Sequence, residues 1–246
     1  TELEHLQALI YVHQHQTKRS HYTFTPWIRG PHSLQMMADV FGMGDLDGAT
    51  LRIGGRMASG KPIQLMDIQL PPEQGADLIR LAHRLDPYYA IESELVEDLF
   101  GADLTWLELE KARYCYGDRK MLLTIGQQGK TIEEVVNILI KHDVALLLDL
   151  REHPDVEQFG FSYEELRTII GKQVQEYEHP LELDLEGYRA SDLEDPIFLI
   201  IRHIIHNLEE RRRVALLVDQ PAPVNEARDL LNDQFMLLQG LEVLDF

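Results

Sequence analysis

Residues 121–154 read MLLTIGQQGKTIEEVVNILIKHDVALLLDLREHP, and this stretch decides the fold. Residues 121–125 form a short apolar run that Gly126 ends, and Thr131 can cap a helix whose apolar residues recur at helical spacing. Residues 144–148 form a second apolar run, as expected for a strand that is buried on both faces of a parallel sheet. The stretch therefore predicts a strand, a helix and a second, parallel strand.

Polar residues follow both predicted strands. Gly126 and Gln127 follow the first strand, and Asp149 and Arg151 follow the second. Open α/β sheets bind ligands at the carboxyl ends of their strands, so we expect these two groups to lie side by side in a candidate site. In extended geometry Asp149 and Arg151 face the same side, where they either pair as a brace between loops or bind a ligand together.

The rest of the C-terminal half continues this alternation. We expect strands at residues 173–177, 214–218 and 241–246, and helices at residues 163–170 and 196–212. The alternation predicts a Rossmann-like α/β domain over residues 119–246, with a parallel-rich sheet flanked by helices and the last strand at an edge.

Two histidines lie three positions apart in the helix expected at residues 196–212. A helical wheel places His203 and His206 opposite the apolar stripe, among charged residues. Such a pair can ligate a metal, but this setting favours a solvated face. We expect neither a metal nor a cofactor in this chain.

The first half of the chain has a different pattern. Helices are expected at residues 3–12, 34–41, 74–85 and 91–114, the last interrupted at Gly101, and two β segments at residues 50–53 and 63–70. Helices around a hairpin predict a smaller winged-helix-like α+β interaction domain over residues 1–118.

One loop of this half is a candidate binding edge. The sequence Trp27-Ile28-Arg29-Gly30-Pro31 places an aromatic side chain and an arginine beside a Gly-Pro turn. Trp27 either contributes to a binding surface or anchors the core, and the sequence leaves both alternatives open.

Composition limits the classes of partner. The chain has 246 residues, one cysteine and a formal net charge of −19. No apolar run approaches the roughly 18 residues that a membrane helix needs, and no basic and then apolar leader opens the sequence, so we expect a soluble, cytoplasmic protein with no membrane partner. The negative charge repels phosphate backbones and therefore disfavours nucleic acid as a partner. This charge either keeps the protein soluble or forms an acidic surface that docks on a basic partner.

Four short motifs occur in order in the C-terminal half. They are Thr124-Ile125-Gly126-Gln127-Gln128, Asp149-Leu150-Arg151-Glu152-His153-Pro154, Gly160-Phe161, and Tyr177-Glu178-His179 with Glu182-Leu183 nearby. Their order and spacing resemble the uncharacterised prokaryotic family catalogued as domain of unknown function 488. Members of that family have Thr-Ile-Gly-His-Ser, Asp-Val-Arg-Ser-x-Pro, Gly-Phe, and Tyr-x-His with Glu-Leu-Gly at these places. The N-terminal TFTPWIRGPHSLQMMADV is also similar to a winged-helix-like region that is fused to some members.

The chain departs from the family pattern at polar and thiol positions. Gln127 stands where the family has histidine. Val218-Asp219-Gln220 and Glu226-Ala227-Arg228 stand where the family has Cys-Ala-Glu and Cys-His-Arg. The resemblance therefore implies that several groups able to ionise or attack have been exchanged, which argues against catalysis.

The first functional hypothesis is a non-catalytic binding or regulatory relative of a nucleotide-binding or anion-binding α/β family. Its ligand would be a phosphorylated or anionic small molecule, held by Gly126, Gln127, Arg151 and Arg228. The N-terminal domain would contact a protein partner.

The alternative is an enzyme that acts on a nucleotide, nucleobase or sugar phosphate. His179 or Glu182 would then be the general acid or base, and Asp149 an orienting carboxylate. For either function we expect Asp149, Arg151, His179 and Arg228 to converge on one concavity. A strand-end surface closed by the Asp149 and Arg151 pair favours the binding protein, whereas an open cleft with a bound anion favours the enzyme.

Overall fold

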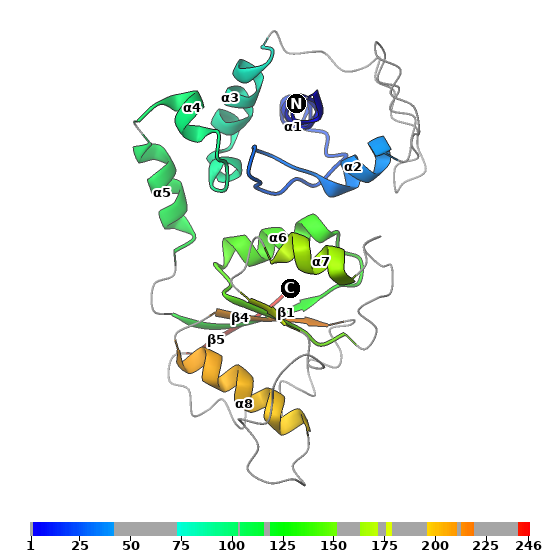
Figure 1. The fold of residues 1–246 in the computed structure, drawn as a ribbon, viewed down its shortest axis with the longest axis vertical. Helices are drawn as coiled ribbons and strands as arrows, with labels where there is room; N and C mark the ends of the chain where they lie inside the picture. Colours follow the sequence, from blue (N-terminus) through cyan, green and yellow to red (C-terminus); the bar gives the residue numbers. More distant parts are fainter. Residues whose placement is uncertain are drawn as a thin grey trace. The chain divides into compact units, whose positions relative to one another are not determined.

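The computed structural model describes residues 2–41, 73–102, 104–115, 119–151, 163–171, 176–178, 196–210, 213–218 and 241–246. The chain divides into two compact units, Thr1–Arg113 and Tyr114–Phe246, which run from blue to green and from green to red in Figure 1. No helix in the described ranges is long and apolar enough to cross a membrane.

The N-terminal unit is helical in its described part. Its helices are α1 (Glu2–Thr17), α2 (Leu34–Phe41), α3 (Ala76–Leu85), the short 3-10 helix η2 (Pro87–Ala90), α4 (Val96–Phe100) and α5 (Thr105–Arg113). The expected interruption at Gly101 is confirmed, because this glycine follows α4 with a φ of 75°. The β segments expected at residues 50–53 and 63–70, on which the winged-helix prediction depends, lie outside the described residues.

Aliphatic and aromatic side chains join α1 to α3 and to the loop that follows α1. Val12 of α1, Phe24 of the loop and Ala82 of α3 are all buried in one cluster. The rings of Tyr11 and Phe24 meet edge to face, with centroids 5.4 Å apart. This core fixes the loop against α1 and so positions the Trp27 segment.

The C-terminal unit contains a five-stranded sheet, as the sequence predicts. Its strands are β1 (Lys120–Gly126), β2 (Leu146–Asp149), β3 (Glu176–Glu178), β4 (Arg213–Val218) and β5 (Leu241–Asp245). They lie in the order β3-β2-β4-β1-β5, and every neighbouring pair is parallel. The expected parallel sheet is therefore confirmed, with β5 at an edge.

The sequence does not specify the order of the strands in this sheet. β4 lies between β1 and β2 and pairs with both. The connection from β1 to β2 therefore skips one strand, and β4 later fills the gap. Any contact between residues that follow β1 and β2 has to cross the end of β4.

Helices cover both faces of the sheet. Figure 1 shows α6 (Ile132–Lys141) and α7 (Tyr163–Ile170) on one face and α8 (Pro196–Glu209) on the other. Right-handed crossovers require this arrangement, because the chain moves outward through α6 and α7 and returns through α8. Alternate strand residues supply the core against α8, namely Leu122, Leu146, Leu148, Val214 and Leu216. The residues between them, Asp149 and Tyr177 among the polar ones, face the side of α6 and α7.

The predicted cap of α6 is confirmed. The Thr131 hydroxyl accepts a hydrogen bond from the Glu134 backbone N–H at 3.3 Å, and the Glu134 carboxylate accepts one from the Thr131 N–H at 2.8 Å. This reciprocal pair satisfies two N–H groups that the first turn leaves without helical partners. It fixes where α6 begins, directly after the turn of residues 126–130.

Candidate functional site

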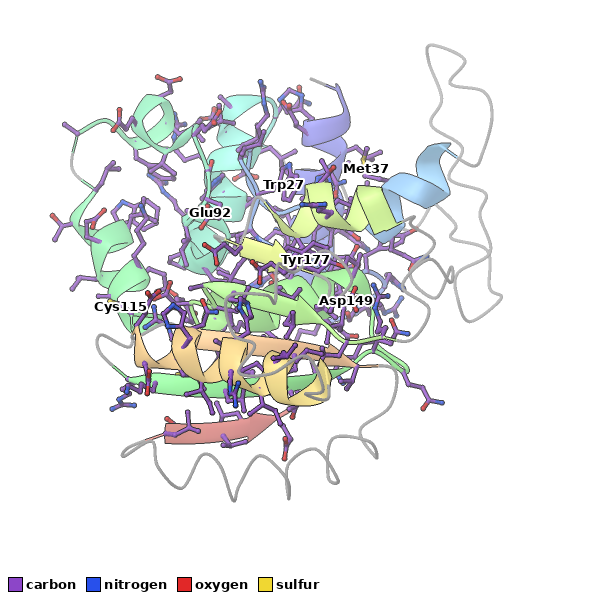
Figure 2. All side chains as sticks on the ribbon, turned by 60° about the horizontal axis from the view of Figure 1, so that its bottom comes forward. Trp27, Met37, Glu92, Cys115, Asp149 and Tyr177 are labelled. Carbon is purple, nitrogen blue, oxygen red and sulfur yellow. The ribbon has the colours of Figure 1, made fainter. Side chains whose placement is uncertain are left out.

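Four side chains meet at the carboxyl ends of the strands. Asp149 ends β2, Arg151 follows two residues later, Gln127 follows β1, and Tyr177 lies in β3. Tyr177 is in register with Leu147, so its side chain emerges on the same face as that of Asp149; both residues are labelled in Figure 2. We call Gln127, Asp149, Arg151 and Tyr177 the strand-end network.

The Arg151 guanidinium lies at the centre of this network. Its Nε donates to Asp149 Oδ1 at 2.7 Å, and its Nη2 donates to Asp149 Oδ2 at 2.5 Å. Its Nη1 donates to Gln127 Oε1 at 2.9 Å. The side chains of Arg151 and Asp149 are both 0% exposed, so the ion pair is shielded from water. The pair is bidentate, the geometry that makes arginine–carboxylate contacts strong and specific.

Asp149 has its acceptor positions filled. In addition to the guanidinium, Oδ1 accepts from the Arg151 backbone N–H at 3.2 Å, and Oδ2 accepts from the Tyr177 hydroxyl at 2.7 Å. Each carboxylate oxygen thus receives two hydrogen bonds, which matches the capacity of an ionised carboxylate. The network holds the ends of β2 and β3 together.

The pKa of Arg151 reflects both burial and pairing. Burial lowers this pKa, but the hydrogen bond and charge of Asp149, together with Tyr177, outweigh burial and raise it above the ordinary arginine value. The guanidinium is therefore always charged, and Asp149 supplies the compensating charge.

Gln127 connects this pair to β1 across the end of β4. Its backbone N–H donates to the Val218 carbonyl of β4 at 2.9 Å, and its buried side chain accepts from Arg151. The Leu150 N–H donates to the Leu217 carbonyl at 2.8 Å, which brings the start of the β2 loop to the same strand. The long side chain of Arg151 can therefore reach a residue two strands away.

The structure tests the expected convergence only in part. It brings Asp149, Arg151 and Gln127 together, and Gly126 ends β1 beside them, where its N–H donates to the Phe246 carbonyl at 3.1 Å. The other three candidates, His179, Glu182 and Arg228, lie outside the described residues. Sequence reasoning did not assign Tyr177 to the site, although the motif Tyr177-Glu178-His179 contains it.

The prediction for His203 is wrong. His203 is 9% exposed, and its Nε2 lies 2.8 Å from Glu178 Oε2. The neighbouring Asn207 donates its amide to the His203 carbonyl at 2.9 Å. His206 is half exposed, and its Nε2 lies 3.3 Å from Glu210 one turn later. Because Tyr177 and Glu178 alternate along β3, one faces Asp149 and the other faces α8.

The loop of residues 25–32 in the N-terminal unit is a tight hairpin. Thr25 and His32 exchange two backbone hydrogen bonds of 2.8 and 2.9 Å, and the Gly30 N–H donates to the Trp27 carbonyl at 3.0 Å. Gly30 has a φ of 113°, a backbone conformation that L side chains rarely adopt. A methyl group on Gly30 would also approach the His83 ring to 3.0 Å, so glycine is required here.

Trp27 is partly buried and begins the turn of this hairpin. Its ring stacks on His32, with centroids 5.3 Å apart and an interplanar angle of 20°. Both rings line a hollow between the hairpin and α1, where Glu4 and Arg29 form an ion pair. Trp27 therefore combines parts of both predicted alternatives, because it packs against a neighbour and also faces a cavity.

No protein-family model matches the chain, and neither a curated protein nor a solved structure matches it. The likeness to domain of unknown function 488 therefore rests on the quoted motifs alone.

Proposed function

We propose that this chain is a non-catalytic binding or regulatory protein in which the strand-end network is a structural brace and the N-terminal unit makes the interactions. The observation that carries the proposal is the enclosed Arg151 guanidinium, which is 0% exposed and donates to both Asp149 oxygens and to Gln127.

An anion clamp needs a cation that can exchange its present partner for a ligand. Arg151 would have to leave a buried bidentate pair, and Asp149 would then lie unpaired out of water. Separating a buried pair in this way costs on the order of 3–5 kcal/mol. The interactions of a small anion with Arg151 would have to exceed this free energy for the anion to bind. The buried pairing supports a brace more strongly than a clamp.

A general base needs a free lone pair directed at the proton that it removes. Asp149 has both oxygens occupied by the guanidinium, a backbone N–H and the Tyr177 hydroxyl. Gln127 stands where the resembled family has histidine, and an amide cannot take up a proton near neutral pH. Both features support a site without acid–base chemistry.

The acidic character of the chain supports a protein partner. A formal net charge of −19 raises the local concentration of basic proteins and repels nucleic acid and free phosphates at long range. The exposed hairpin of the N-terminal unit, rather than the enclosed strand ends, presents side chains that a partner can reach.

Nuclear magnetic resonance of arginine Nε–H groups tests the proposal. We expect the Arg151 Nε–H to exchange slowly with water and to keep its chemical shift when millimolar inorganic phosphate is added. The exposed Arg29 provides the matched control, because its Nε–H should exchange fast. A saturable phosphate-induced shift of the Arg151 Nε–H signal, with no matching shift at Arg29, would overturn the brace and favour the enzyme alternative with His179 or Glu182 as acid or base.

A further inference from the structure

A hollow of about 180 Å³ lies between the first turns of α1 and residues 27–32 of the hairpin. A water molecule occupies about 30 Å³ in the liquid, so the hollow has room for one long side chain rather than for a single water. Its walls include Glu4, Trp27, Arg29, Pro31 and His32. We call it the α1–hairpin pocket.

The wall of the α1–hairpin pocket is fixed before any ligand arrives. Buried Gln7 of α1 accepts from the Ser33 N–H at 3.0 Å and donates to the Ser33 carbonyl at 3.2 Å, which ties the end of the hairpin to the helix. The Glu94 N–H donates to the Ile28 carbonyl at 2.8 Å and holds the hairpin tip. A preformed wall lowers the entropic cost of binding.

The wall combines an aromatic face with a carboxylate. Trp27 and His32 stack, and Glu4 lies on the helix side of the same hollow. Burial lowers the pKa of His32 to about 4, so this ring is neutral at physiological pH and does not repel a cation. Aromatic faces and carboxylates are the groups that recognise guanidinium ions.

The pocket already holds a guanidinium from its own chain. Arg29 Nε lies 3.1 Å from Glu4 Oε1, and Arg29 Nη1 donates to Glu4 Oε2 at 3.3 Å. The Arg29 side chain is 49% exposed, and ion pairs this accessible to water contribute little to stability. Another guanidinium that also contacts Trp27 can therefore take the place of Arg29 on Glu4.

We propose that the α1–hairpin pocket binds an arginine side chain of a partner protein, with Glu4 exchanging Arg29 for the partner's guanidinium. This inference rests on the proposed function, because it names the chemistry that the N-terminal unit recognises. A protein rather than free arginine is the source, since Ile28 is 41% exposed beside the pocket and offers apolar contact to a neighbouring residue of the partner. The net charge of −19 favours the approach of a basic protein.

Fluorine NMR of protein labelled with fluorotryptophan provides the assay. The chain has two tryptophans, Trp27 in the pocket and Trp106 in α5, where Trp106 packs on Phe100 and serves as the internal control. The probe is a short peptide with one arginine next to one leucine, and the comparison peptide replaces arginine with citrulline, which has the same shape without the charge. We expect the arginine peptide to shift the Trp27 signal saturably and to leave Trp106 unchanged. The citrulline peptide should bind at least about five-fold more weakly.

Variants of the ion pair give opposite expected effects. Glu4→Gln should weaken the binding of the arginine peptide at least about five-fold, because this change removes the charged acceptor. Arg29→Gln should tighten binding by about two- to five-fold, because it removes the internal competitor. Asp77→Asn removes the same charge from an exposed carboxylate that pairs with Arg80 elsewhere in the unit, and it should change nothing.

Three outcomes would overturn the inference. Equal binding of the citrulline peptide would show that charge is not recognised. Weaker binding after Arg29→Gln, with Glu4→Gln neutral or tighter, would mean that the pocket takes an anion through Arg29. If N-acetylarginine amide binds as tightly as the peptide and Ile28→Ser has no effect, free arginine rather than a protein is the ligand. None of these results depends on Arg151. The proposal for the α1–hairpin pocket can therefore be wrong while the structural role proposed for the strand-end network remains correct.

Discussion

The two units each contain a bidentate arginine–carboxylate pair, and the pairs differ in their access to water. Arg151 and Asp149 are both 0% exposed, whereas Arg29 and Glu4 are 49% and 21% exposed. The buried pair has hydrogen bonds of 2.5 and 2.7 Å, and the accessible pair has contacts of 3.1 and 3.3 Å. We propose that this difference makes the buried pair a permanent brace and the accessible pair an exchangeable contact.

The surroundings explain this difference. The Tyr177 hydroxyl and a backbone N–H fill the acceptor positions of Asp149 that the Arg151 guanidinium leaves open. Glu4 lies on the first turn of α1 beside the α1–hairpin pocket, which is partly open to solvent. Burial raises the free energy needed to separate Arg151 from Asp149. Exposure to water lowers the free energy needed to separate Arg29 from Glu4.

Breaking the buried pair should give the largest effect. Arg151→Met leaves Asp149 uncompensated and should lower the free energy of unfolding of the C-terminal unit by about 3–5 kcal/mol. Glu4→Gln in the accessible pair should cost less than about 1 kcal/mol. Both tryptophans lie in the N-terminal unit, so tryptophan emission in urea measures the unfolding of that unit. Amide hydrogen exchange of β1 and β4 measures the unfolding of the C-terminal unit.

Two further variants sharpen this contrast. Tyr177→Phe removes one of the four hydrogen bonds to Asp149 and should cost about 1–3 kcal/mol. Asp149→Leu with Arg151→Met removes both charges and should cost less than the sum of the single variants. An increase in stability after Arg151→Met would contradict the brace, since residues kept for function often destabilise the fold.

Acid should weaken the N-terminal unit by a smaller amount. Burial lowers the pKa of His32 to about 4, so the folded unit binds fewer protons than the unfolded chain below the ordinary histidine pKa. The contribution of neutral His32 to the free energy of unfolding is fully present above about pH 6.5 and is lost as the pH falls toward 4. About 2 kcal/mol of this free energy is lost between roughly pH 7 and pH 5. Burial also lowers the pKa of His83, which adds a loss of the same sign.

Urea unfolding followed by tryptophan emission measures this pH dependence. His32→Gln should reduce the loss, and His21→Gln, which changes an exposed histidine, should not. A unit that becomes more stable on mild acidification, or a pH dependence unchanged by His32→Gln, would refute the assignment to His32.

The smallest expected effect is on nucleic acid. The net charge of −19 opposes binding, and Arg29 near the hairpin is paired with Glu4, while Arg52 and Arg56 lie outside the described residues. Affinity for random duplex DNA should not exceed the weak end of non-specific binding, roughly 10⁻⁴ M. Fluorescence anisotropy with a labelled duplex measures it. Micromolar binding that weakens steeply with salt and is lost on Arg52→Ala with Arg56→Ala would point to DNA instead.

The strands were predictable because their apolar runs are short, continuous and bounded by polar or glycine residues. Their order was not predictable. The run at 214–218 resembles the others, and nothing local shows that β4 enters between β1 and β2. That placement depends on which face each crossover helix covers, which is a long-range property. The predicted closeness of the two strand-end groups is confirmed by the contact from Arg151 to Gln127, although this contact has to cross the end of β4.

Side-chain partners were harder to predict than elements. The described part of β3 is three residues long, too short for alternation to show that Tyr177 faces Asp149 and Glu178 faces α8. His203 was placed on a solvated face from its charged neighbours, but Glu178 provides a partner that lies far away in sequence. The pair Asp149 and Arg151 was predictable, because a spacing of two in an extended segment directs both side chains to one side.

Native mass spectrometry of the purified protein tests the central claim most directly, namely that the strand-end network is a brace and not a ligand site. We predict a single species at the mass of the bare chain, 28.4 kDa, for the unmodified sequence and, apart from the mass of the substitution, for Arg151→Met. A stoichiometric additional mass corresponding to a phosphorylated or other anionic small molecule, present in the unmodified protein and absent from Arg151→Met, would contradict the claim and place a ligand at Arg151.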